Sequence, residues 1–173
     1  MSDLTRRLAR LRVPLGFAGA VAALWFAAPT RTTLAAGTLV ALAGEAVRVW
    51  AAGHLNKSRE VTASGPYRFV AHPLYVGSSI MGAGLAIAAN SILVAALVAL
   101  YLATTITAAV RSEEAFLRAR FGDGYDRYRR GAADGARRFS IAQAIANREY
   151  RAVGGLVAAV LLLLWKATYN GTL

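Results

Sequence analysis

The stretch Gly65-Pro66-Tyr67-Arg68-Phe69-Val70-Ala71-His72-Pro73-Leu74-Tyr75-Val76-Gly77 decides how the chain is organised, because it separates two long apolar segments. It contains two of the four prolines and one of the two histidines in the sequence. Proline suits the first turn of a helix, where backbone amides have no intrahelical partner. We therefore predict that a membrane-spanning helix begins at Pro73, directly after a link that is unusually rich in polar and aromatic side chains.

The composition is that of a membrane protein. Of the 173 residues, 57% are hydrophobic and 17% are charged, whereas about a quarter of the residues in soluble domains are charged. The apolar residues form long runs, which favours an all-α polytopic fold in a single domain over residues 1–173. The absence of cysteine excludes disulfides, thiolate metal sites and a cysteine nucleophile. The sequence does not specify an oligomeric state.

Five transmembrane helices are predicted. Their approximate bounds are 13–28, 34–55, 73–89, 92–110 and 152–169. We interpret the first as an uncleaved span rather than a secretory signal, because further spans follow it. Asn90-Ser91 is a tight turn, so the third and fourth spans are expected to form an antiparallel hairpin, with Ser91 capping the fourth span.

A cytoplasmic helical segment is predicted between the fourth and fifth spans. Its first part carries an apolar-aromatic stripe at helical spacing, and Gly122 and Gly124 are expected to bend it. The stripe consists of Leu117, Phe121, Tyr125 and Tyr128. A second, short helix over Phe139–Asn147 is expected at the membrane interface.

The net charge of +11 follows the predicted topology. Residues 1–12, 54–72 and 111–151 hold 4, 3 and 10 of the 20 Lys and Arg residues. Cytoplasmic loops carry such an excess, so the N-terminus is predicted in the cytoplasm and the C-terminus on the opposite side. Basic residues at the ends of apolar runs suit anionic lipid headgroups rather than nucleic acid. Alanine- and arginine-rich usage indicates a bacterial inner membrane.

Two charges lie inside the second predicted span. Glu45 and Arg48 are three residues apart and so share one helical face. Charges at this depth face a bundle interior or a polar cavity. Two interpretations stay open: a mutual ion pair, or a role for Arg48 in orienting a substrate.

The hairpin brings two polar clusters together. In an antiparallel hairpin, the start of the third span and the end of the fourth lie at the same membrane face. His72, Tyr75, Glu113 and Glu114 are therefore predicted to be neighbours. Without a function, the glutamates would be a solvated pair balanced by nearby arginines, and His72 a hydrogen-bonding residue at a helix start. His54 and His72 have different surroundings, so no metal site is predicted.

These clusters also carry a resemblance to a known family. The stretch from Ser64 to Gly77 resembles the Gly-Pro-Tyr…Arg-His-Pro-x-Tyr-x-Gly signature of the isoprenylcysteine carboxyl methyltransferases, which are related to phospholipid N-methyltransferases. The segment Glu113-Glu114-x-x-Leu117-x-x-x-Phe121-Gly122-x-x-Tyr125-x-x-Tyr128 resembles their second signature, and Gly82-Ala83-Gly84 their Gly-x-Gly element. Two departures concern the substrate: Ala71 stands where the family has arginine, and no arginine-aromatic-proline segment follows Tyr128.

The resemblance implies an integral membrane methyltransferase that uses S-adenosyl-L-methionine and binds it in the region 65–130. The lipophilic acceptor, an isoprenoid-type carboxylate or a lipid amine, would come from the bilayer. The residues that this resemblance assigns to the cofactor are His72, Pro73, Tyr75, Gly82, Gly84, Glu113 and Glu114. Candidate catalytic residues are Arg68, as a replacement for the arginine missing at Ala71, and His72 and Glu114, as proton acceptors for an amine substrate. Charge placement adds Arg48, Arg127 and Tyr128 as candidates for orienting the acceptor.

Two other functions fit parts of the sequence. Membrane sterol or enone reductases share a similar Arg-His-Pro-like stretch but use NADPH, and the Glu113-Glu114 pair argues against them. A non-enzymatic membrane scaffold gives no reason for the two clusters to converge.

Overall fold

The computed structural model describes residues 19–57, 59–131, 135 and 137–173, and every regular element in them is helical. Residues 19–26 form the first described helix. The elements that follow are α2 (Arg31–His54), the 3₁₀ helix η1 (Gly65–Arg68), α3 (Pro73–Ala89), α4 (Ile92–Phe121), α5 (Asp123–Arg129), α6 (Ile141–Ala146) and α7 (Tyr150–Tyr169). The all-helical prediction is confirmed for this part of the chain.

Helices α2, α4 and α7 are long and apolar enough to cross a membrane, and α3 is a shorter apolar helix of 17 residues. The bounds of α3 match the prediction, while α4 continues to Phe121 as the expected extension beyond residue 110. Part of the first predicted span, residues 13–18, lies outside the described residues, as do residues 1–12. The chain is a helical membrane protein, and the count of five spans stays a prediction.

The α3–α4 turn forms as the sequence predicts. Asn90 adopts the left-handed conformation with φ 49°, which asparagine tolerates better than most residues. The hydroxyl of Ser91 accepts a 3.5 Å hydrogen bond from the backbone amide of Val94. This cap starts α4 directly after the turn, so α3 and α4 are an antiparallel hairpin.

Small residues bring α2 and α3 into backbone contact. A Cβ added at Gly37 would lie 2.3 Å from the backbone nitrogen of Ala88, and one added at Gly84 would lie 2.3 Å from that of Ala41. Gly44 meets the backbone of Met81 in the same way. Such close approach is available to small residues alone, so the glycines fix the distance between α2 and α3.

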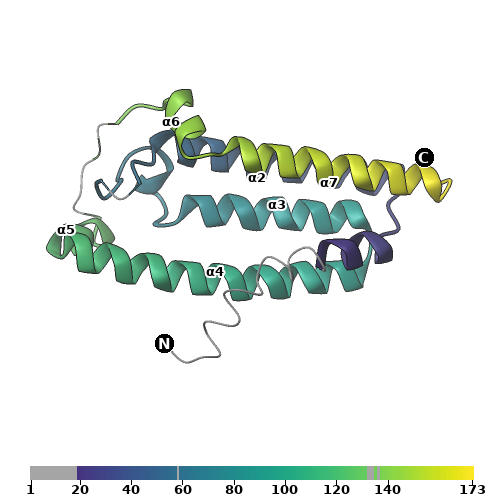
Figure 1. The fold of residues 1–173 in the computed structure, drawn as a ribbon, viewed down its shortest axis with the longest axis horizontal. Helices are drawn as coiled ribbons and strands as arrows, with labels where there is room; N and C mark the ends of the chain where they lie inside the picture. The colour runs from purple at the N-terminus through teal and green to yellow at the C-terminus, as the bar shows by residue number, and fades with distance from the viewer. Residues whose placement is uncertain (1–18, 58, 132–134, 136) are drawn as a thin grey trace.

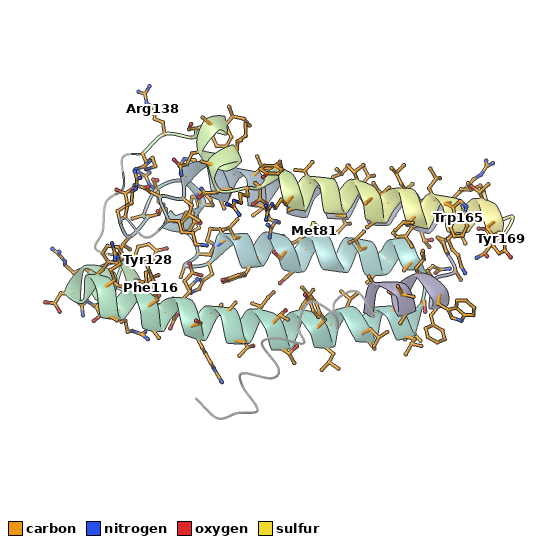
Figure 2. The ribbon with its side chains drawn as sticks, viewed as in Figure 1. Met81, Phe116, Tyr128, Arg138, Trp165 and Tyr169 are labelled. Carbon is orange, nitrogen blue, oxygen red and sulfur yellow. The ribbon has the colours of Figure 1, made fainter. Side chains whose placement is uncertain are left out.

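Helix α3 is the centre of the bundle, since it contacts α2, α4 and α7. Figure 1 shows α4 along one side of α3 and α7 along the other, with α5 and α6 at one end. We call that end, which includes η1, the η1 end. Trp165 and Tyr169 lie at the opposite end from Tyr128 (Figure 2).

Helix α6 is fastened to the end of α2. The side-chain amide of Asn147 donates hydrogen bonds of 2.8 Å to the carbonyl oxygens of Ala52 and Leu55. Gln143 donates a further hydrogen bond of 2.9 Å to Leu55. The short helix predicted over 139–147 is present as α6, and these bonds hold it at the η1 end.

Candidate functional site

His72 lies between η1 and α3, and its ring reaches both glutamates of α4. Its Nδ1 is 3.6 Å from Oε2 of Glu113, and its Nε2 is 3.5 Å from Oε1 of Glu114. The ring of Tyr75 lies 5.8 Å from that of His72, centroid to centroid. The hairpin therefore brings together the four residues expected to be neighbours, and their roles stay predictions.

The contacts between His72 and the two glutamates shift the titration of this cluster. Hydrogen bonding to Glu113 raises the pKa of His72, although burial acts in the opposite direction, and Glu114 raises it further. Hydrogen bonding from His72, and then from Tyr75, lowers the pKa of Glu113 despite its partial burial. His72 and Glu113 are therefore an ion pair at pH values between these two pKa values.

The two glutamates differ in how fully they are engaged. Glu114 lies 3.4 Å from Nη1 of Arg118 and 3.8 Å from Nη1 of Arg129, in addition to its contact with His72. For Glu113 the ion pair found among the described residues is the one with His72. Its side chain is 38% exposed, against 20% for Glu114. Glu113 is therefore the carboxylate with capacity for a further partner.

Helix α5 folds back toward this cluster. The bend expected near Gly122 is confirmed: α4 ends there, and Gly122 has φ 47°, a conformation that favours glycine. The hydroxyl of Tyr128 then donates to the carbonyl oxygens of Tyr67, at 2.9 Å, and Val70, at 3.5 Å. These bonds join α5 to the segment that leads into His72.

Tyrosine side chains of α5 and of the η1 segment are buried or partly buried at this end of the molecule. Tyr125 is fully buried, with Cζ of Arg118 over its ring at 5.6 Å from the centroid. Its hydroxyl has no hydrogen-bond partner among the described residues. Burial raises the pKa of Tyr67, and raises that of Tyr128 to about 12, so both phenols are neutral at physiological pH.

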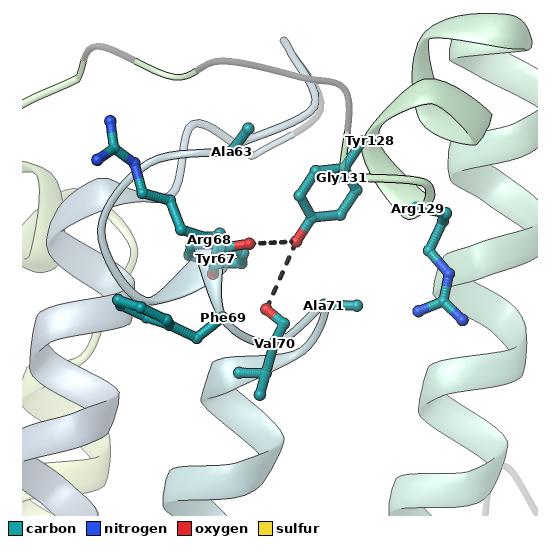
Figure 3. A pocket seen from close by; sticks show the side chains of 9 residues that line it. All are labelled: Ala63, Tyr67, Arg68, Phe69, Val70, Ala71, Tyr128, Arg129 and Gly131. Carbon is teal, nitrogen blue, oxygen red and sulfur yellow. Dashed lines mark hydrogen bonds between the residues drawn. The ribbon is translucent and has the colours of Figure 1, made fainter.

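A cavity of about 510 Å³ is lined by residues of α5 and of the η1 segment, beside the hydrogen bonds of Tyr128 (Figure 3). Binding pockets for small molecules commonly measure about 300–1,000 Å³. Figure 3 shows the guanidinium of Arg68 directed away from Ala71, and its Nη2 donates a 2.9 Å hydrogen bond to the carbonyl oxygen of Gly135. Arg129 lies on the Ala71 side of the cavity. Replacement of the missing arginine by Arg68 stays a prediction.

Arg48 is held in a separate buried cluster. Its Nε lies 2.8 Å from Oε1 of Glu149 and 3.6 Å from Oε2 of Glu45, and its Nη1 donates to the hydroxyl of Ser78. Both carboxylate side chains are 8% exposed. Of the two interpretations of Arg48, the ion pair is present, but its shorter partner is Glu149 rather than Glu45.

The other predicted site residues lie at different positions around α3 and α5. Pro73 is fully buried at the first position of α3. Gly82 faces α4, where an added Cβ would lie 2.6 Å from Cδ1 of Leu102, whereas Gly84 packs against α2. Arg127 is exposed on α5. None of these contacts joins them to His72, and their assigned roles stay predictions.

Sequence reasoning missed Glu149 and Arg129. Glu149 lies 101 residues from Arg48, and no local pattern links them. The signal for Arg129 was available: a helix that bends at Gly122 can return its basic residues to Glu114.

The fold and this cluster define a class: a helical membrane protein in which one histidine meets two adjacent glutamates across a helical hairpin. The family model described as phospholipid methyltransferase matches residues 32–124, more than half of the chain. The chain belongs to this family, which bears out the resemblance to membrane methyltransferases.

A curated relative is similar over part of its length. The chain is 35% identical over 111 residues to "Nickel-cobalt-cadmium resistance protein NccN" of Alcaligenes xylosoxydans xylosoxydans, covering 63% of the chain and 51% of the relative. The chain thus spans about half the length of that protein. No solved structure is significantly similar. The described residues contain no group of three or more His, Cys, Asp or Glu side chains arranged to hold a metal ion.

Proposed function

We propose that this chain is an S-adenosylmethionine-dependent methyltransferase that acts on a lipophilic acceptor at the cytoplasmic face of the membrane. The observation that supports this most directly is the convergence of His72 on Glu113 and Glu114, at 3.6 and 3.5 Å. All three residues lie inside the segment that matches the family. Their contacts cross the hairpin, so they depend on the fold and not on local sequence.

The residues present suit the cofactor. Its ammonium group needs an acceptor, and Glu113 is a partly exposed carboxylate with capacity for it. The cavity of about 510 Å³, whose lining is linked to this cluster through Arg129 and Glu114, is of a suitable size for such a ligand. When bound, the cofactor supplies a methyl group on a positively charged sulfur. The chain supplies orientation and the exclusion of water.

The acceptor would be an amphiphile from the bilayer. A carboxylate acceptor is already ionised and needs no base, whereas an amine must first lose a proton, for which His72 or Glu114 is the candidate acceptor. Arg127 and Tyr128 on α5 are candidates for orienting its headgroup. Arg48 is a weaker candidate, because Glu149 and Ser78 already occupy its guanidinium.

A binding experiment tests the proposal. Purified protein in detergent is titrated with S-adenosylmethionine, S-adenosylhomocysteine and NADPH by calorimetry and thermal shift. We expect both adenosyl compounds to bind, and Glu113→Gln to weaken S-adenosylmethionine about tenfold, as loss of one charge-assisted hydrogen bond predicts. Glu60→Gln, which removes the carboxylate of an exposed pair with Arg137, is the matched control. Stabilisation by NADPH alone would refute the proposal and favour a reductase.

A further inference from the structure

Two arginines line the cavity, and Arg129 is the one that contacts the His72 cluster, through Glu114. It ends α5, lines the cavity together with Ala71, and carries its guanidinium on the Ala71 side (Figure 3). Arg68, the other arginine of the cavity, is directed elsewhere and is hydrogen-bonded to Gly135. An anionic group bound beside His72 would therefore meet Arg129.

The ion pair found for Arg129 among the described residues is too long to satisfy its guanidinium. Its Nη1 is 3.8 Å from Oε1 of Glu114, whereas charge-assisted hydrogen bonds measure about 2.7–2.9 Å. Glu114 is also nearer to Arg118, at 3.4 Å, and to His72, at 3.5 Å. The Arg129 side chain is 44% exposed and lines the cavity, so it has capacity for a further partner there.

An accessible carboxylate lies on the other side of the same contact. Glu113 joins the cluster through Nδ1 of His72, while Arg129 joins it through Glu114, which contacts Nε2 of the same ring. The His72–Glu114 contact thus has an available negative charge on one side and an available positive charge on the other. An amino-acid zwitterion carries an ammonium group and a carboxylate on one carbon, so it offers one charge of each sign to these two residues.

We propose that Arg129 and Glu113 recognise the amino-acid end of the cofactor: Arg129 pairs with its carboxylate, and Glu113 with its ammonium group. This inference rests on the proposed function and adds to it a residue from α5 that the sequence did not single out. It also gives α5 a part in binding, because that helix carries Arg129 to the site. The alternative is that Arg129 only fastens α5 to α4 through Glu114.

Removing the carboxylate from the ligand distinguishes these two roles. Dissociation constants for S-adenosylmethionine and decarboxylated S-adenosylmethionine are measured by calorimetry on full-length protein in detergent, for the wild type and for Arg129→Ala. We expect the wild type to prefer the carboxylated ligand at least tenfold. Arg129→Ala should lose this preference, because it weakens only the ligand that has a carboxylate. Arg130→Ala, which removes an adjacent exposed arginine outside the cavity lining, should keep the preference.

The other charge is tested in the same way. Glu113→Gln should weaken S-adenosylhomocysteine at least tenfold and leave its deaminated analogue unchanged. If Arg129→Ala weakens both S-adenosylmethionine and its decarboxylated form equally, Arg129 only holds α5 in place and the inference is wrong. If the wild type binds all of these adenosyl compounds but ignores the missing carboxylate, the inference fails while the proposed function stands. If the wild type binds none of them, the proposed function itself fails.

Discussion

Replacing Tyr125 with phenylalanine should make the unliganded protein more stable. Tyr125 is fully buried, and its hydroxyl has no hydrogen-bond partner among the described residues. A buried polar group without a partner costs about 1–3 kcal/mol, and Tyr125→Phe removes that cost. The ring stays, so the contact with Arg118 at 5.6 Å is retained. The expected change is therefore a gain in the free energy of unfolding of about 1–3 kcal/mol.

Tyr128→Phe is the matched control, with the opposite sign. Its hydroxyl donates to Tyr67 and Val70, and losing such a bond costs about 0.5–1.5 kcal/mol. Thermal unfolding in detergent, followed by tryptophan fluorescence, measures both variants. For a chain of this size about 1 kcal/mol shifts the melting temperature by about 2–4 °C. If Tyr125→Phe lowers the melting temperature as much as Tyr128→Phe does, the Tyr125 hydroxyl is hydrogen-bonded in solution, and the reasoning from its burial is refuted.

Three further variants test the ion pairs and the helix packing. His72→Gln should destabilise the protein most below pH 6.5, the ordinary pKa of histidine, because the pKa of His72 is raised in the folded state. In melting curves from pH 5 to 9, the difference in melting temperature from the wild type should shrink as the pH rises through that folded-state pKa, and a constant difference would contradict the ion pair. Glu149→Ala removes the shorter of the two carboxylate contacts of Arg48 and should lower the free energy of unfolding by about 3 kcal/mol in a denaturant titration. A loss below about 0.5 kcal/mol would show that the pair contributes no more than an exposed salt bridge. Gly84→Ala forces a Cβ against the α2 backbone and should cost about 1–3 kcal/mol, whereas Gly154→Ala, where an added Cβ meets nothing within 4 Å, should be neutral or stabilising; equal effects in thermal unfolding would argue against the close packing.

The helices were predictable because their signals are local. Pro73 marks the start of α3, Ser91 caps α4, and Gly122 ends it, and each of these works within a single turn. The contact of His72 with Glu113 and Glu114 was also predictable, because a two-residue turn forces the helices that it joins to pack antiparallel. The number of membrane spans is a different matter, because it depends in part on residues 13–18, which lie outside the described part of the chain.

The contacts that sequence reasoning missed depend on tertiary packing. The sequence left two candidate partners for Arg48, a substrate and Glu45. In the structure its closest carboxylate belongs to Glu149, directly before α7. Nothing in the hydrophobic pattern fixes the rotation of α7 around α2. The position of Arg129 likewise depends on the direction in which α5 leaves Gly122. The hydrogen bonds of Tyr128 hold α5 in that direction.

Helix α4 is long and apolar enough to cross a membrane, and it carries both glutamates on one continuous helix. Its 30 residues give a length of about 45 Å, against about 30 Å for the hydrocarbon core of a bilayer. His72 belongs to a different support, the segment leading into α3, which the glycine contacts lock to α2. A thicker or thinner bilayer changes the tilt of a long helix. Tilting α4 against the α2–α3 pair would move Glu113 and Glu114 relative to His72, so we expect the spacing of the charged cluster to change with the thickness of the surrounding lipid.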